Sequence, residues 1–335
     1  MDSMEFIPFN CISSELRGSL SSTPLLPEEF ALLAKGYHEL CASLHGIHQL
    51  YLSYKWNYDK YAKELRIGYD DVVESVSESH LACGGKRVDS KLYMDVNCLV
   101  SNVISSGQSL IEPLRTFVKS DMGLDDKNAS SFDRMIRARH GEKGVYFLFS
   151  NLRNYVQHGQ LVVSLYRVSS AETKASFDLF QLRNPIHFEV KGTFRDFLNQ
   201  MDEKLKSCNA VTRRLSLGYH VEQYDCFVCE VYGEFLKCVK DHIKRSQKPF
   251  FDMLKKHRQY VGHFNGQDYV LYYENGIVHM VEGLQAPLSK THSVRRQEIE
   301  RSLKQAKGRY DQGRKYLKRT KNPDLFYIER GEAIW

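Results

Sequence analysis

Apolar residues recur every three or four positions through much of the chain, which is the spacing of one face of an α-helix. The longest such stripe runs from Phe30 to Leu65, about five heptads without a break. Pro27, Glu28 and Glu29 suit the first turn of this helix, where proline needs no N–H and acidic side chains complement the helix dipole. At 1.5 Å per residue the helix is roughly 55 Å long, so it needs antiparallel neighbours along its length.

Similar stripes predict further helices near residues 90–119, 131–139, 143–158, 193–207 and 219–260. Pro113 is expected to kink the first of these or to mark its last turns, and Gly159 is expected to stop the third. Nearer the C-terminus, one more amphipathic helix is predicted by an apolar face that contains Ile299, Leu303, Ala306, Tyr310 and Leu317.

Two segments favour β-hairpins instead. Residues 161–168 and 176–182 are rich in strand-forming residues and can pair, and residues 269–281 contain Asn275-Gly276, a favoured type I′ turn. The pattern therefore predicts a mainly α fold, an antiparallel helical bundle with one or two small β-hairpins. We expect residues 1–265 to form the bundle, with a small β insertion near 161–183, and residues 266–335 to form a β-hairpin and a basic C-terminal helix or tail.

Composition limits the class of protein. Hydrophobic residues make up 42% of the 335 positions and aromatic residues 12%, which excludes a largely disordered chain. The first sixteen residues lack a basic patch followed by an apolar core, and no apolar run approaches the roughly 18–20 residues that span a bilayer. We therefore expect a soluble, cytoplasmic protein that does not bind membranes.

Two groups of residues could bind a metal ion. Cys226 and Cys229 have the spacing of a zinc-ligand pair, with Cys238 and His242 after them, and His45 and His48 lie on the longest helix. Zinc-ligand pairs usually lie on turns, whereas these positions fall within predicted helices. Buried thiols and packed histidines are therefore the preferred interpretation, and no metal or other cofactor is expected.

The net charge of +6 is concentrated near the C-terminus. Residues 290–321 contain twelve Lys or Arg against three acidic residues, so the rest of the chain is slightly acidic. Basic side chains here could follow the phosphate backbone of RNA, and the candidates are Arg296, Lys304, Lys307, Arg314, Lys315, Lys318 and Arg319. The apolar face of the same helix equally favours docking on the acidic body of the protein.

The strongest candidate chemistry lies at residues 151–159, which read NLRNYVQHG. Arg153 and His158 are separated by four residues, and Asn154 follows the arginine directly. All three fall outside the apolar face of their predicted helix, so its core does not need them. On a regular helix, however, Arg153 and His158 diverge by roughly 140°, and one copy of the chain makes a poor site.

This segment resembles the signature of the HEPN superfamily (higher eukaryote and prokaryote nucleotide-binding domains). In that signature an Arg, commonly followed by a polar residue, is separated from a His by four to six residues. The resemblance covers residues 92–238 through their order of helices, but the specific match is confined to the motif. It implies a metal-independent endoribonuclease, a homodimer whose protomers build one composite cleft, and a role as a toxin or phage-defence nuclease in bacteria. An antitoxin or sensor partner is consistent with such a role.

The chemistry expected of these residues is cleavage of RNA by its own 2′-hydroxyl. His158 can exchange a proton at cellular pH, and Arg153 can hold the scissile phosphate and stabilise charge on its oxygens. Asn154 can orient His158 or bond the phosphate. The expected products are a 2′,3′-cyclic phosphate and a 5′-hydroxyl, and DNA should resist because it lacks the nucleophile.

Other features keep an alternative open. The bare spacing also occurs at Arg134/His140, Arg213/His220, Arg214/His220 and Arg258/His263. Capping of the helix C-terminus is by itself enough to explain a His at this position, and some HEPN domains lack nuclease activity. Some HEPN toxins carry a Tyr two residues after the His as a target for a partner nucleotidyltransferase, but this chain has Gln160 there. The alternative is a non-catalytic helical module that dimerises or binds nucleic acid through its basic tail.

Overall fold

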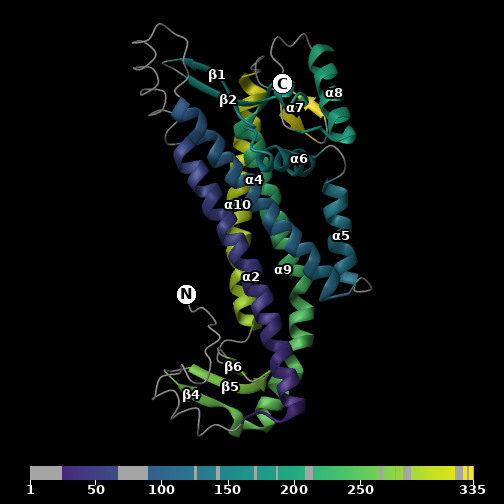
Figure 1. Ribbon diagram of the computed structural model, residues 1–335, viewed down its shortest axis with the longest axis vertical. Helices are drawn as coiled ribbons and strands as arrows, with labels where there is room; N and C mark the ends of the chain where they lie inside the picture. Colours follow the sequence, from purple (N-terminus) through teal and green to yellow (C-terminus); the bar gives the residue numbers. More distant parts are fainter. Residues whose placement is uncertain are drawn as a thin grey trace. The chain divides into compact units, whose positions relative to one another are not determined.

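The computed structural model describes residues 25–66, 90–123, 127–140, 144–169, 172–185, 188–207, 214–264, 267–275, 277–281, 288–320, 327–329 and 332–334. Helices dominate these ranges (Figure 1). They are α2 (Glu28–Arg66), α4 (Ser90–Ser120), α5 (Lys127–His140), α6 (Val145–Gln157), α7 (Leu179–Arg183), α8 (Gly192–Ser207), α9 (Leu217–Lys256), the 3-10 helix η2 (Arg258–Tyr260) and α10 (Leu288–Thr320).

The strands form small antiparallel sheets, and the predicted mainly α fold with small β-hairpins is confirmed. One sheet has the order β1 (Ser164–Ser169), β2 (Glu172–Asp178), β3 (Arg214–Ser216). A second has the order β4 (Gly262–Phe264), β5 (Gln267–Glu274), β6 (Ile277–Val281), and β7 (Tyr327–Glu329) pairs with β8 (Glu332–Ile334). Asn275 has a φ of 51°, as the predicted tight turn between β5 and β6 requires.

Most predicted helices agree with the observed ones, and the differences have local causes. Pro113 lies inside α4, which continues to Ser120. The prediction that residues 176–182 form one strand is wrong at its end, because α7 begins at Leu179. The Asp178 side chain accepts hydrogen bonds from the N–H groups of Phe180 (2.9 Å) and Gln181 (3.3 Å), and this N-cap starts the helix.

Contacts divide the chain into two compact units, each built from separate stretches of sequence. The first contains residues 1–48 and 236–298, and the second contains residues 49–235 and 299–335. α2, α9 and α10 therefore each contribute a segment to both units. This grouping differs from the division predicted after residue 265, which stays a prediction.

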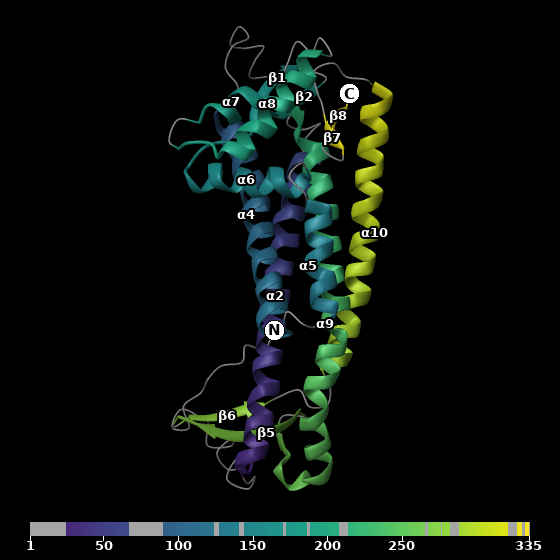
Figure 2. The ribbon, with the colours of Figure 1, turned by 90° about the vertical axis from the view of Figure 1, so that its right-hand side faces the viewer.

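In the second unit, α9 packs against α2, α4 and α10, and residues of α5 and α6 also contact it (Figure 2). Tyr51 of α2 stacks on Tyr232 with ring centroids 4.3 Å apart, and Tyr58, further along α2, donates to Glu222 (2.7 Å), which precedes Tyr232. α2 and α9 therefore run antiparallel. α10 is also antiparallel to α9, since Tyr310 pairs with Tyr219 near the start of α9 through a hydroxyl contact of 2.9 Å and Ile299 lies beside a later residue, Gly233.

α4 runs parallel to α9 in the same unit. Gly107 approaches Tyr224 so closely that a Cβ at position 107 would lie 2.5 Å from the Tyr224 hydroxyl oxygen. Further along both helices, Phe117 meets Phe235 with ring centroids 5.6 Å apart. The close approach at Gly107 requires glycine. α6 also packs against α4.

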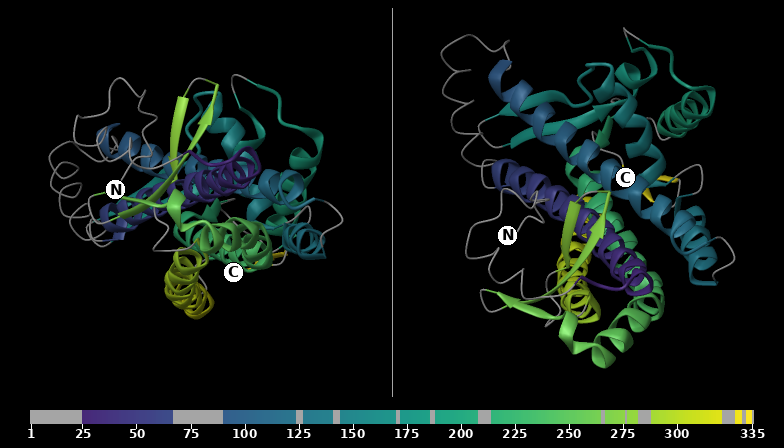
Figure 3. Two further views of the ribbon diagram at one scale, coloured as in Figure 1. Left: turned by 90° about the horizontal axis from the view of Figure 1, so that it is seen from below. Right: turned by 60° about the horizontal axis from the view of Figure 1, so that its bottom comes forward.

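The first unit is built around a hairpin that packs on the N-terminal part of α2 (Figure 3). The backbone N–H of Leu26 donates to the Leu271 carbonyl of β5 (3.2 Å), and Lys35 forms an ion pair with Glu274. Tyr37 stacks on Phe250 of α9 with ring centroids 4.9 Å apart.

In the ranges described, no helix has a stretch apolar and long enough to cross a membrane.

Candidate functional site

The predicted motif lies at the C-terminal end of α6. The helix ends at Gln157, one residue earlier than predicted, and His158 is its C-cap. Gly159 follows with a φ of +70° and donates its N–H to the Val156 carbonyl (3.1 Å), while the Gln160 N–H donates to the Tyr155 carbonyl (2.8 Å). This is a Schellman motif, and a left-handed residue other than glycine would cost about 1–2 kcal/mol. The prediction that Gly159 stops the helix is confirmed.

Arg153 faces α4. Its Nη1 lies 2.7 Å from the Glu112 Oε1, and the two side chains are 28% and 59% exposed. Exposed pairs of this kind contribute about 0–1 kcal/mol to stability. The guanidinium is thus held in a defined place by an interaction that a phosphate can replace at little cost.

His158 points to a different place. Its exposed ring stacks on Phe188 with centroids 4.8 Å apart and planes 20° apart. The two rings lie at a cavity of about 180 Å³ between the end of α6 and the start of α8. The rest of the cavity wall consists of Asn151, Asn154, Tyr155, Glu189, Val190, Lys191 and Phe194.

The three predicted catalytic residues are therefore only partly together in one chain. Asn154 and His158 share the cavity wall, whereas Arg153 lies outside it beside Glu112. The His158 backbone N–H donates to the Asn154 carbonyl (3.0 Å), and within the described ranges no side-chain hydrogen bond joins these two residues. A single chain can supply a histidine and an amide to one bound group, but it directs its arginine elsewhere.

The residues with the same spacing lie in different settings. His220 is fully buried, its ring nitrogen lies 2.5 Å from the Ser216 carbonyl, and burial lowers its pKa to about 4. Arg214 pairs with Asp178 (3.3 Å) and His263 with Asp268 (2.9 Å). Arg213 and the side chain of His140 lie outside the described residues.

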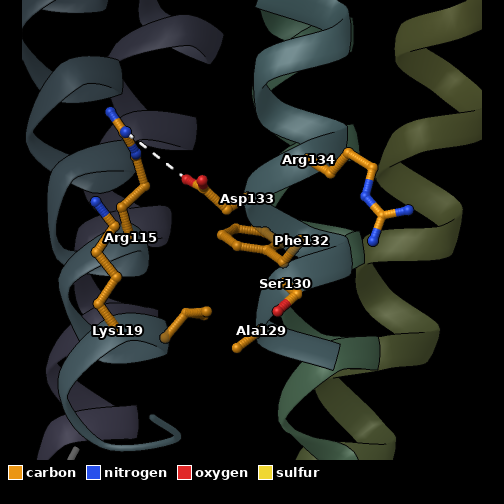
Figure 4. A pocket seen from close by; sticks show the side chains of 8 residues that line it. Arg115, Lys119, Ala129, Ser130, Phe132, Asp133 and Arg134 are labelled. Carbon is orange, nitrogen blue, oxygen red and sulfur yellow. Dashed lines mark ion pairs between the residues drawn. The ribbon is translucent and has the colours of Figure 1, made fainter. Parts of the chain in front are cut away.

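A second cavity, of about 310 Å³, lies between α4 and α5 (Figure 4). Arg115 and Lys119 line its α4 side, and Arg115 pairs across the cavity with Asp133 of α5 (3.8 Å). Figure 4 shows Arg134 directed away from α4. Because Asp133 already balances one cation, this cavity is a weaker anion site than its three basic residues suggest.

The basic residues of α10 divide between a docked face and an exposed face. Ile299 and Ala306 are buried, so this part of the helix is docked in the second unit. Docking was one of the two possibilities that the sequence left open, and binding of RNA by the basic side chains was the other. Lys307 pairs with Glu230 (3.1 Å). Among the other candidates, Arg296 and Arg314 are half-buried and the side chain of Arg319 lies outside the description, but three are exposed: Lys304, Lys315 and Lys318.

A buried charged cluster lies under α10 and was not predicted from the sequence. The Arg309 guanidinium contacts Asp225 (2.5 Å) and Glu222 (3.2 Å) on α9, and Lys55 of α2 also contacts Asp225 (3.1 Å). Tyr58 donates to Glu222, and burial among these acids raises the pKa of its hydroxyl well above the ordinary value. Two acids three residues apart, Glu222 and Asp225, with Val221, Tyr224 and Phe227 between and beside them, were the available sign of this cluster.

Cys226 and Cys229 lie on α9, as the helical interpretation predicts. Burial raises the pKa of the Cys226 thiol to about 12, which disfavours the thiolate that metals bind. Across the described ranges, no three His, Cys, Asp or Glu residues are placed to hold a metal ion together.

No protein-family model, curated protein or solved structure matches this chain. The chemistry of the site is therefore inferred from its residues alone. An exposed imidazole, an amide, an ammonium group and a carboxylate surround one aromatic cavity, and the half-buried guanidinium of Arg153 lies on the same helix as the imidazole and the amide. Such a set can bind an anionic, aromatic ligand and transfer a proton to or from it.

Proposed function

We propose that this protein is a metal-independent endoribonuclease of the HEPN type, in which His158 acts as general acid and base. The observation that carries the proposal is the exposed His158 ring at a cavity that also contains Asn154 and Lys191. A histidine accessible to solvent can exchange protons with a substrate, whereas a buried one such as His220 cannot.

The reaction uses the 2′-hydroxyl of RNA as nucleophile. His158 removes its proton as the oxygen attacks the adjacent phosphorus, the bond to the 5′-oxygen breaks, and a second proton transfer converts that oxygen to a hydroxyl. The products are a 2′,3′-cyclic phosphate and a 5′-hydroxyl, and no water or metal-bound hydroxide enters the step. Arg153 stabilises the charge that develops on the phosphate oxygens, and Asn154 bonds the same phosphate or orients His158.

Two features support a homodimer in this function. Arg153 contacts Glu112 on α4, whereas His158 faces the cavity beside α8, so one chain does not aim both groups at one phosphate. A two-fold axis that brings two α6 ends together would place the arginine of one copy near the histidine of the other. RNA would then bind across both copies. A role in bacterial or phage defence, and regulation by an antitoxin or sensor partner, belongs to the same proposal.

A second candidate is non-catalytic RNA binding by α10. The observation that favours it is the exposed face with Lys304, Lys315 and Lys318 opposite the docked Ile299 and Ala306. Such a surface binds phosphates without sequence preference and with strong salt dependence.

Cleavage of end-labelled single-stranded RNA in EDTA separates the two candidates. His158→Ala should slow cutting by about 10²–10⁴-fold and Arg153→Ala by about 10²–10³-fold. Glu112→Gln should cut at least as fast as the wild type, because it releases Arg153 from its ion pair. His263→Ala is the matched control, since His263 has the same spacing to an arginine and is also exposed. Equal activity in all variants would mean that another site or a contaminant cuts the RNA, and no cutting by the wild type would favour the binding module.

A further inference from the structure

We infer that the cavity beside His158 binds one unpaired nucleobase of single-stranded RNA. The inference rests on the proposed function and names the part of the substrate that this cavity holds. Three properties of the cavity support it, namely its aromatic wall, its size and its polar groups.

The wall of the cavity offers aromatic faces. Phe188 is half-exposed, stacks on His158, and meets the ring of Tyr155 edge-on at 4.7 Å and 84°. Tyr155 and Phe194 are only 2% and 1% exposed, and their rings contact each other in the protein interior next to Phe188. Stacking on aromatic side chains is the usual way in which proteins bind unpaired bases, and it tolerates any base.

The size of the cavity fits a base rather than a larger ligand. Its volume of about 180 Å³ is smaller than the roughly 300–1,000 Å³ of sites that enclose drug-sized molecules. The sugar and phosphate of the same nucleotide would therefore remain outside, at the level of the exposed His158 ring. That position places the scissile phosphate within reach of the proposed acid and base.

Most polar groups at the cavity match a nucleotide in kind, and the exception is the exposed Glu189 carboxylate, which pairs with Arg195 (3.5 Å). Asn154 can bond a base edge or a phosphate through its amide, and Lys191, which is exposed, can pair with a phosphate. Asn151 uses its amide N–H on the Phe147 carbonyl (2.8 Å), so it helps to fix the wall.

The test is equilibrium binding of two oligonucleotides of equal length that cannot be cleaved. One is 2′-O-methyl oligouridylate, and the other carries the same backbone with no bases. The wild type should bind the base-bearing probe about tenfold or more tightly than the abasic probe. Phe188→Leu should reduce this ratio to about two, whereas Phe188→Tyr, which keeps the aromatic face, should preserve it.

Phe180→Leu is the matched control, because Phe180 is an exposed phenylalanine in the same unit that does not line the cavity. A ratio near one in the wild type, or an unchanged ratio in Phe188→Leu, would overturn the inference. Cleavage is not needed for this measurement. If the wild type cuts RNA but Phe188→Leu leaves the binding ratio unchanged, only the base site is refuted. If the binding ratios are as expected but the wild type does not cut RNA, only the nuclease function is refuted.

Discussion

His220 is a buried histidine whose protonation links stability to pH. It lies near the start of α9, is fully buried, and contacts the Ser216 carbonyl, and desolvation lowers its pKa to about 4. In the unfolded chain a histidine takes up its proton near pH 6.5. Between these two values the unfolded state binds more protons, so the stability that His220 contributes is complete above pH 6.5 and is lost as the pH falls towards 4.

We therefore predict that wild-type protein loses about 2 kcal/mol more free energy of unfolding between pH 7 and pH 5 than His220→Gln does. Urea unfolding at both pH values measures this difference. The comparison is made within each protein, so any loss of packing in the variant cancels. An equal pH dependence in both proteins would show that His220 does not titrate in this range.

At the residue scale, the sequence predicts side chains set by local structure better than those set by packing. The Gly159 stop and the position of Arg153, Asn154 and His158 outside the core of α6 follow from helical periodicity. The contacts of Glu112 with Arg153 and of Phe188 with His158 do not, because each joins residues distant in sequence. Phe188 lies in a segment without periodicity, so nothing in the sequence indicated its partner.

At the element scale, α10 combines a buried charged contact with an exposed one. Arg309 forms ion pairs with Asp225 and Glu222, whose side chains are 0% and 8% exposed. Lys307 forms an ion pair with Glu230, and the Lys307 side chain is 53% exposed. Removing one partner of a buried ion pair leaves an uncompensated charge, but an exposed pair contributes little. The two residues therefore stabilise the same helix very differently.

Arg309→Met should lower the free energy of unfolding by about 3 kcal/mol, because Lys55 alone then compensates the buried Asp225. Lys307→Met, on the same helix, should lower it by less than about 1 kcal/mol. Denaturant unfolding of both variants measures the effect. Equal losses would mean that the Arg309 cluster is not desolvated in solution.

The apolar stripe of α10 predicted a docking face, and Ile299 and Ala306 are buried accordingly. The Arg309 cluster was not predicted, because charge counts along a helix do not reveal which acids on another helix are buried. The basic tail therefore looked more available to RNA in the sequence than it is in the structure.

At the scale of the whole molecule, the fold class follows from the pattern of apolar positions, but the assembly of segments does not. Periodicity is local, so it identifies α2, α4 and α9. It does not show that β3 pairs with β2, or that stretches on either side of His48 and Phe235 join separate units. Those pairings depend on contacts between distant segments.

The proposed composite site predicts that activity depends on assembly. Cleavage per chain should fall on dilution below the dissociation constant of the dimer, because a monomer separates Arg153 from His158. Sedimentation at the same concentrations should show a species with the mass of two chains giving way to one. Constant cleavage per chain at concentrations where only monomer sediments would refute the two-fold arrangement.

The most direct test of the proposed mechanism is mass spectrometry of the fragments that form when the wild type is incubated with single-stranded RNA in EDTA. The 2′-O-methyl form of the same RNA and the His158→Ala variant serve as controls. The proposed mechanism predicts fragments with 2′,3′-cyclic phosphate and 5′-hydroxyl ends from the wild type, and none from either control. Fragments with 3′-hydroxyl and 5′-phosphate ends, or equal cutting by His158→Ala, would contradict it.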